Sequence, residues 1–282
     1  MTFSVPDLLK HKQQRQPIVM VTAYDFPSAR FAEQAGVDMI LVGDSAANVV
    51  LGLDRTTAIT MDTMLVLAAA ARRGAGTTHV VGDLPFMTYE ASNEDAVRSA
   101  GRFVADAGCD AVKLEGGGAM VQRVKAVSDA GIAVIGHLGL TPQRAARFGG
   151  MRVQARTCAR AIALLDDALA LEAAGAVAIV LEAIPASIAA AVTERLAIPT
   201  IGIGAGASCD GQVLVYHDIL GLGAAAPPSF VRQYAALGDA SRDALARYAA
   251  DVRTGGFPLN GEEYRMAAEE LAAFTKALAD RA

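Results

Sequence analysis

Short hydrophobic runs recur along the chain, and several of them end on a polar, mostly ionisable residue. Five such runs are Met39–Asp44, Thr78–Asp83, Ala111–Glu115, Ile132–His137 and Val177–Glu182. In a β-strand alternate side chains point the same way, so Lys113 and Glu115 share one face, with Val112 and Leu114 on the other. A buried lysine or glutamate needs a partner. The open end of a barrel meets this need more easily than a closed core.

The segments between these runs are predicted to be amphipathic helices. One helix should run from about Met61, after the N-cap candidate Thr60, to Arg73, and another from Cys158 to Ala174. Further strands are predicted at Ile18–Ala23 and Ile198–Ile203, with a weaker eighth at Gln212–Tyr216. Alternating buried strands and helices indicate a parallel sheet.

The polar strand ends favour a closed (β/α)8 TIM barrel over the alternative, an open doubly wound sheet, because a barrel gathers the carboxyl ends of its strands at one mouth. We expect a single domain, with a short helix or arm over residues 1–16 and the barrel over about 17–223. Additional C-terminal helices should occupy about 224–282. Their predicted positions are 229–236, 241–252 and a last helix that begins at an Asn260 and Glu263 capping box and ends near Ala279.

Composition narrows the class of protein. A net charge of -5 and a pI near 5.4 give no basic surface for nucleic acid. The three cysteines have no C-x-x-C spacing, so neither a disulfide framework nor a zinc cluster is indicated, and each should be a buried or semi-buried apolar residue. Lys10, His11 and Lys12 precede no apolar leader, which favours a cytoplasmic protein.

The most hydrophobic window, Ala173–Val192, does not indicate a membrane span. Glu182 and Pro185 interrupt it, and the β-branched residues near Val177 indicate a strand instead. We therefore expect no membrane partner. The mean hydropathy of +0.33 is nonetheless high for a soluble monomer, and buried subunit interfaces are the expected destination of the excess apolar surface.

Three carboxylates end adjacent strands of the predicted barrel. Asp44, Asp83 and Glu115 converge there without matching histidines or thiolates, which favours a hard oxygen-binding cation, Mg²⁺ before Zn²⁺. The alternative is that each acid caps a helix or pairs with an arginine. Because the three follow neighbouring strands, the metal site is the preferred interpretation.

Lys113, His137 and Glu182 are the candidate catalytic residues. Lys113 could place its charge on a substrate carboxylate or enolate, could form a Schiff base, or could simply pair with Glu115. His137 could shuttle a proton or be a satisfied structural group. Glu182 follows five apolar residues, so desolvation should raise its pKa toward that of a general base; the alternative is an ion pair with an arginine such as Arg156.

The glycine-rich segment Gly202–Gly206 could bind an anion after the seventh strand. It lacks the spacing and the following acid of a dinucleotide motif, and no Walker-type lysine follows it. No nucleotide cofactor is therefore expected.

Several motifs together closely resemble the ketopantoate hydroxymethyltransferase family. They are Val21–Pro27, Val42–Ser45, Gly82–Phe86, Ala111–Gly117, Gly136–Gln143, Thr200–Gly206, Cys209–Val215 and His217–Gly221. The similarity runs from about residue 5 to 223 in the family's order. It implies a (β/α)8 barrel, a homodecamer of two stacked pentameric rings, and one Mg²⁺ per site.

The resemblance also implies the reaction and the roles of the site residues. The family transfers a hydroxymethyl group from 5,10-methylenetetrahydrofolate to 3-methyl-2-oxobutanoate in pantothenate biosynthesis, giving 2-dehydropantoate. Asp44, Asp83 and Glu115 would stand around the metal, and Asp44, Ser45, Asp83 and Lys113 around the 2-oxo acid. Glu182 would accept the proton, with His137 beside it.

Two other functions are compatible with these residues. One is a Mg²⁺-dependent 2-oxo acid lyase or mutase of the phosphoenolpyruvate mutase and isocitrate lyase group, which shares strand-end acids and enolate chemistry. The other is an inactive barrel that only binds the 2-oxo acid. A pure binder needs no desolvated base, so the presence of Glu182 argues against the second.

Overall fold

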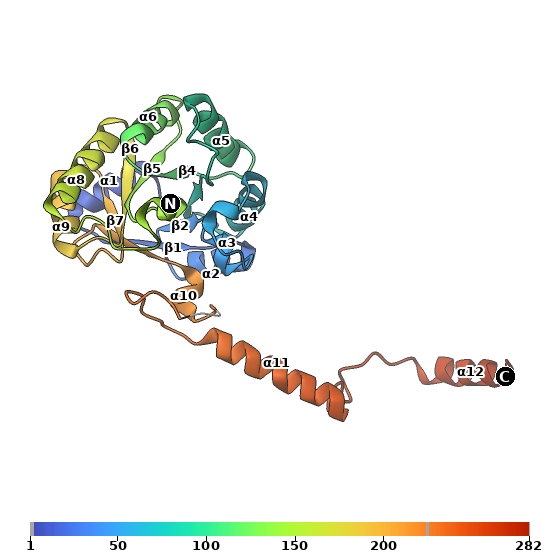
Figure 1. The fold of residues 1–282 in the computed structure, drawn as a ribbon. Coiled ribbons are helices and arrows are strands. Elements are labelled where there is room, and N and C mark those ends of the chain that lie inside the picture. Colours follow the sequence, from blue (N-terminus) through green and yellow to red (C-terminus); the bar gives the residue numbers. More distant parts are fainter. Residues whose placement is uncertain (1–2, 224–225, 282) are drawn as a thin grey trace. The chain divides into compact units, whose positions relative to one another are not determined.

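The computed structural model describes residues 3–223 and 226–281, and its centre is a closed barrel of eight parallel strands in sequential order (Figure 1). The strands are β1 Ile18–Thr22, β2 Met39–Val42, β3 His79–Asp83, β4 Ala111–Glu115, β5 Val134–Gly139, β6 Ala176–Glu182, β7 Thr200–Ile203 and β8 Gly211–Leu214. Closure between β8 and β1 confirms the predicted TIM barrel and excludes the open sheet. The eighth strand begins at Gly211, one residue before its predicted start at Gln212.

Helices surround the barrel as the βα alternation requires. They are α1 Val5–Gln14, α2 Phe26–Gln34, α3 Ala46–Val49, α4 Met61–Gly74, α5 Asn93–Ala105, α6 Val121–Asp129, α7 Ala145–Phe148, α8 Cys158–Ala173, α9 Ala186–Arg195 and α10 Tyr216–Leu220. Three 3₁₀ turns lie among them, η1 Thr56–Ala58, η2 Gly118–Met120 and η3 Pro142–Arg144. The Thr60 hydroxyl accepts a hydrogen bond from the Thr63 amide at 3.3 Å, which confirms the predicted N-cap of α4.

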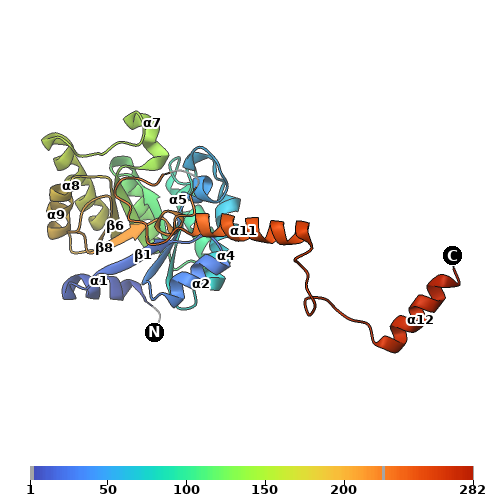
Figure 2. The same ribbon diagram turned by 90° about the horizontal axis from the view of Figure 1, so that it is seen from below.

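Apolar side chains form two layers, one inside the barrel and one between strands and helices. Alternation along β4 places the Ala111 side chain in the inner layer and those of Val112 and Leu114 in the outer layer. Leu8 of α1 belongs to the inner layer and is fully buried. Figure 2 shows α1 at the opposite end of the barrel from α7. The amino ends of the strands are thus filled with apolar side chains, which leaves the carboxyl ends for polar chemistry.

Contacts divide the chain into two compact units, residues 1–234 and 235–282. The second unit holds α11 Leu237–Thr254 and α12 Ala268–Ala279. Among the described residues no helix is both long and apolar enough to cross a membrane.

Some local predictions were wrong. Residues 229–236 form turns and extended chain instead of a helix. The last helix begins at Ala268 rather than near Asn260, whose side-chain oxygen accepts a hydrogen bond from Arg265 instead of capping a helix. Cys109 is buried and Cys209 half-buried, but Cys158, at the start of α8, is exposed.

Candidate active site

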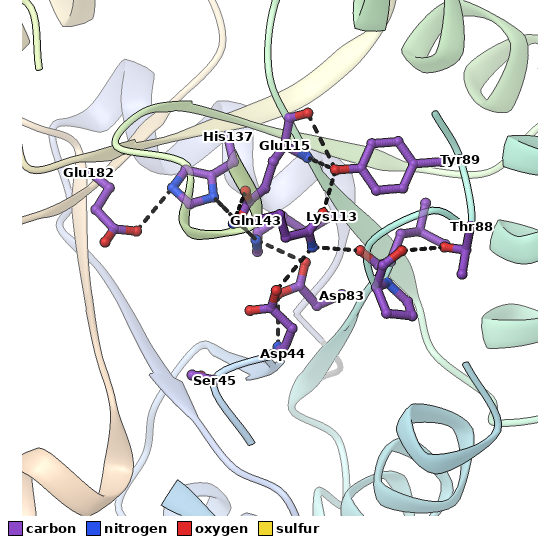
Figure 3. A network of polar contacts seen from close by, with 12 residues as sticks. Asp44, Ser45, Asp83, Thr88, Tyr89, Lys113, Glu115, His137, Gln143 and Glu182 are labelled. Atoms are coloured by element: carbon purple, nitrogen blue, oxygen red, sulfur yellow. Dashed lines mark hydrogen bonds and ion pairs between the residues drawn. The ribbon is translucent and has the colours of Figure 1, made fainter. Parts of the chain in front are cut away.

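The register of the parallel strands brings the polar strand ends together. Asp83 of β3 lies beside Lys113 of β4, and Glu115 lies beside His137 of β5. Each of these four residues is buried. Their side chains meet at the carboxyl end of the barrel, as the alternation along β4 predicted (Figure 3).

Lys113 supplies the buried cation of this cluster. Its Nζ lies 2.8 Å from Asp83 Oδ1, 3.2 Å from His137 Nδ1 and 4.0 Å from Glu115 Oε1. Burial alone would lower the pKa of Lys113, but the surrounding carboxylates, Asp83 first, outweigh it and raise this pKa above its usual value. Lys113 is therefore a fixed positive charge at neutral pH, so it does not act as a free amine.

His137 connects Glu115 to Glu182. Its Nδ1 lies 3.4 Å from Glu115 Oε1 and its Nε2 lies 3.1 Å from Glu182 Oε2, so the ring stands between the two carboxylates (Figure 3). Burial and the charge of Lys113 disfavour the imidazolium, but hydrogen bonds to Glu115 and Glu182 prevail and raise the pKa of His137 to about 9. A protonated ring donates toward both carboxylates, and this fixes the position of Glu182.

Asp44 and Asp83 are held close together in a low-dielectric site. The Asp44 amide donates to Asp83 Oδ2 at 3.0 Å. Burial, followed by the charges of Asp83 and Glu115, raises the pKa of Asp44 well above its usual value. Burial also raises the pKa of Asp83, although Lys113 opposes the shift. The pKa of Glu115 is lowered instead: burial opposes this, but His137 outweighs burial.

Gln143 and Tyr89 complete the network and were missed as site residues from the sequence. Gln143 Nε2 donates to Asp44 Oδ2 and to the Leu84 carbonyl, both at 3.0 Å, and its amide donates to Glu115 Oε2 at 3.1 Å. The Tyr89 hydroxyl donates to Gln143 Oε1 at 2.7 Å. Gln143 ends the Gly136–Gln143 motif, and that motif was the only signal for it in the sequence.

All the residues predicted for the site line one cavity of about 230 Å³. They are Asp44, Ser45, Asp83, Lys113, Glu115, His137 and Glu182. Ser45 Oγ lies 2.9 Å from the Tyr24 hydroxyl, at the edge of the network. Within the described ranges, Glu182 pairs with His137 and not with Arg156, so the ion-pair alternative proposed for Arg156 does not hold.

The carboxylates were tested as a possible cation site. Asp83 Oδ1 and Glu115 Oε1 are buried and have only ion-pair contacts, with Lys113 at 2.8 Å and His137 at 3.4 Å. Burial, and after it the charges of Asp83 and Glu115, raise the pKa of Asp44, and an added cation would oppose both effects. This oxygen-only donor set fits a hard divalent ion. No three acidic, histidine or cysteine side chains in residues 3–223 and 226–281 are grouped so that they could hold a metal by themselves. The three-carboxylate ligand set therefore stays a prediction.

We expect Gln143→Leu to destabilise the protein and disturb the site. The substitution removes the donor to Asp44 and the acceptor of the Tyr89 hydroxyl, and each buried group left unsatisfied costs about 1–3 kcal/mol. Thermal unfolding measures this loss. Gln154→Leu is the control, because Gln154 is also buried but makes a single side-chain hydrogen bond, to the Arg152 carbonyl. Equal losses at both positions would contradict the special role of Gln143.

Comparison with known proteins identifies the family. The family model of ketopantoate hydroxymethyltransferase matches residues 2–260. The chain belongs to the ketopantoate hydroxymethyltransferase family. A 3-methyl-2-oxobutanoate hydroxymethyltransferase of Geobacillus kaustophilus is 52% identical over 264 residues, covering 94% of this chain and 95% of that protein. One from Carboxydothermus hydrogenoformans is 50% identical over 268 residues, covering 95% and 97%. The resemblance drawn from the motifs is thereby confirmed.

Solved structures with the same fold are more distant in sequence. A phosphonopyruvate hydrolase in complex with oxalate and Mg²⁺ has a TM-score of 0.61 at 16% identity, covering 100% of this chain and 97% of that one. A 2,3-dimethylmalate lyase of the phosphoenolpyruvate mutase and isocitrate lyase superfamily has a TM-score of 0.58 at 19% identity, with 100% of both chains covered. At these identities the likeness shows the barrel fold alone. The match to the ketopantoate hydroxymethyltransferase family is therefore stronger evidence than the structural likeness, and it favours that family over the lyase and mutase alternative.

Proposed function

We propose that this protein transfers a hydroxymethyl group from 5,10-methylenetetrahydrofolate to 3-methyl-2-oxobutanoate, giving 2-dehydropantoate for pantothenate biosynthesis. The observation that carries the proposal is the row of Lys113, His137 and Glu182 beside three carboxylates in one small cavity. The row provides a positive charge for a 2-oxo acid and a positioned carboxylate for its C3 proton. These are the two requirements of enolisation.

Mg²⁺ is the divalent ion that we propose for the site. Asp44, Asp83 and Glu115 would hold it, and when bound it would polarise the oxo group and make the C3 proton more acidic. Mg²⁺ usually keeps several water molecules and takes only one or two protein carboxylates together with substrate oxygens. A close cluster of three protein ligands is therefore not required.

The chain's own residues divide the remaining work. Glu182 accepts the C3 proton at its carboxylate, and His137 orients that carboxylate through Nε2 at 3.1 Å. Lys113 stabilises the negative charge that develops on the oxo oxygen, because it is buried and already charged. Asp44, Ser45, Asp83 and Lys113 would surround the 2-oxo acid. The nucleophilic C3 then attacks the methylene carbon of the folate as one C–N bond breaks. Water replaces the second nitrogen and supplies the hydroxyl oxygen, and the two nitrogens take up the water proton and the proton held by Glu182, which releases tetrahydrofolate.

Hydrogen exchange without any folate tests this proposal. With Mg²⁺ in D₂O, proton NMR should show loss of the C3 proton signal of 3-methyl-2-oxobutanoate, and EDTA should stop the exchange. Loss of the exchange on addition of EDTA would also show that the reaction needs a divalent ion. If no exchange occurs and added folate gives no turnover, the transferase proposal is wrong.

We also propose that the protein forms the family's homodecamer. Large apolar side chains remain exposed on two adjacent helices of the barrel: Phe31 of α2 is 59% exposed and Val66 of α4 is 68% exposed. Exposed large apolar side chains on neighbouring helices are typical of subunit contacts. Burial of these side chains between subunits would account for the high mean hydropathy of the sequence.

A further inference from the structure

A second, larger cavity borders the candidate active site. Its volume is about 870 Å³, against about 230 Å³ for the cavity that holds Lys113 and Glu182. The two cavities have no lining residue in common, but residues adjacent in the chain line one and the other. Gly116, which directly follows Glu115, lines the large one, and the loop after β5 contributes Thr141 to the large cavity and Pro142 to the small one. A ligand of the large cavity would therefore lie across this stretch of chain from the 2-oxo acid.

Size separates the two substrates of the proposed reaction. Sites for ligands of drug size span about 300–1,000 Å³, so the small cavity suits a short 2-oxo acid but cannot also hold a reduced folate. The large cavity falls within that range. The second substrate therefore needs a separate volume close to the first, and the large cavity is an adjoining volume of that size.

Three arginines give the large cavity a positive character. Arg144, Arg147 and Arg160 line it, and in the part of the chain that the structure describes none of them forms an ion pair with an acidic side chain. Arg147 and Arg160 are exposed, which places them at the rim. Arg144 lies deeper: its guanidinium packs over Gly116, where an added Cβ would come within 2.6 Å of it. Guanidinium groups in this setting bind carboxylates.

One acidic side chain of the cavity, Glu90, has a single oxygen without a partner, since its Oε2 accepts the Tyr89 amide at 3.4 Å. Glu90 Oε1 is buried and accepts no hydrogen bond. Burial raises the pKa of Glu90, and the nearby charge of Arg144 opposes the shift, so the two groups lie within electrostatic range. The other acid of the cavity, Asp167, is already occupied, since its Oδ1 accepts the Gly118 amide at 2.8 Å. Glu90 is thus available to accept hydrogen bonds from a ligand.

Apolar side chains lie between these polar groups. Phe86, Met87 and Phe148 line the cavity, and Phe86 and Met87 are 38% and 59% exposed. Met87 has a φ of +67°, a left-handed conformation that is uncommon for residues other than glycine. Its backbone is thus held in a costly state at the cavity wall, as is often found where a ligand binds.

We propose that this cavity binds the reduced folate, with the pteridine at the inner end and the glutamate tail at the rim. A pteridine presents an amino group and a ring N–H side by side, which match the Glu90 carboxylate, whose Oε1 is unpaired and whose Oε2 holds only the long bond from the Tyr89 amide. The aminobenzoyl ring matches the apolar wall of Phe86 and Phe148. The glutamate carboxylates match Arg147 and Arg160. This inference rests on the proposed function and adds the location of its second substrate.

The test compares two variants, a double substitution of the rim arginines and Glu90→Gln, with two ligands. For Arg147→Ala/Arg160→Ala we expect the KM for 5,10-methylenetetrahydrofolate to rise about tenfold, because two charge-assisted contacts are lost. Inhibition by 6-methyltetrahydropterin, which has no glutamate tail, should be unchanged. Glu90→Gln should weaken both ligands. Arg156→Ala is the control, because Arg156 is an exposed arginine between α7 and α8 that does not line the cavity.

Folate-free C3 proton exchange, measured on every variant, separates this inference from the proposed function. It should remain at the unsubstituted rate, since none of the altered residues lines the small cavity. If the folate KM is unchanged in the double variant and in Glu90→Gln, the folate binds elsewhere while the transferase function stands. If exchange falls together with folate binding, the residues support the fold or the 2-oxo acid, and the inference is also wrong. Failure of the unsubstituted enzyme to exchange or turn over would refute the proposed function itself.

Discussion

Glu182→Gln should abolish enolisation while leaving the 2-oxo acid bound. We expect folate-free C3 proton exchange to fall by about 10²–10⁴-fold, the usual contribution of a positioned general base. The amide is nearly isosteric with the carboxylate, and its oxygen can still accept a hydrogen bond from His137 Nε2. It cannot accept the C3 proton. The measurement is the NMR exchange rate in D₂O with saturating Mg²⁺.

A binding measurement and a control variant show whether Glu182→Gln affects proton transfer alone. Titration calorimetry with 3-methyl-2-oxobutanoate and Mg²⁺ should give a Kd within a few fold of the unsubstituted protein. Glu194→Gln is the matched control, because Glu194 is an exposed glutamate on α9 that does not line the small cavity. If Glu182→Gln exchanges the proton at the normal rate, another group is the base. His137 would then be the first candidate, because it is the ring in contact with Glu182.

The sequence allowed the barrel and most of the site to be predicted for one physical reason. Parallel strands of period two fix which side chains face the barrel interior, and closure brings their carboxyl ends together. Because Lys113 and Glu115 are two residues apart on one strand, their side chains point to the same side, and this was enough to place them in one cavity. Adjacent strands then supplied Asp83 and His137 at matching register positions.

Gln143 and Tyr89 could not be predicted in this way, because neither lies on a strand. Gln143 lies in the 3₁₀ turn η3, and Tyr89 lies in the segment between β3 and α5. Loop conformation sets where their side chains point, and hydrophobic periodicity carries no information about it. The same limit applies to residues 229–236, where a helix was predicted but the chain forms no helix. Asn260 shows a related failure, since its capping motif was present in the sequence but its side chain is used by Arg265.

Lys113→Met should affect both stability and catalysis, and a second substitution can separate the two effects. Methionine has a similar length but no charge, so the buried carboxylate of Asp83 would lose its cation at 2.8 Å. Breaking one side of a buried ion pair costs about 3–5 kcal/mol. Thermal and urea unfolding should show this loss. Exchange of the C3 proton should fall by about 10²–10³-fold, as expected when a buried charge that stabilises a developing oxyanion is removed.

Lys113→Met/Asp83→Asn should recover most of the stability but none of the exchange. Asparagine is neutral, so no unpaired charge is buried, and its side-chain oxygen can still accept the Asp44 amide. The charge that acts on the substrate is still missing, so enolisation stays slow. If the double variant regained exchange together with stability, Lys113 would serve only to neutralise Asp83. If stability stayed low, the charge of Lys113 would be needed by carboxylates other than Asp83, of which Glu115 Oε1 lies 4.0 Å from Nζ. Recovered stability without exchange would show that Lys113 stabilises the fold as the partner of Asp83. The catalytic role of its charge is then taken from the single variant, because Asp83→Asn also removes a proposed Mg²⁺ ligand.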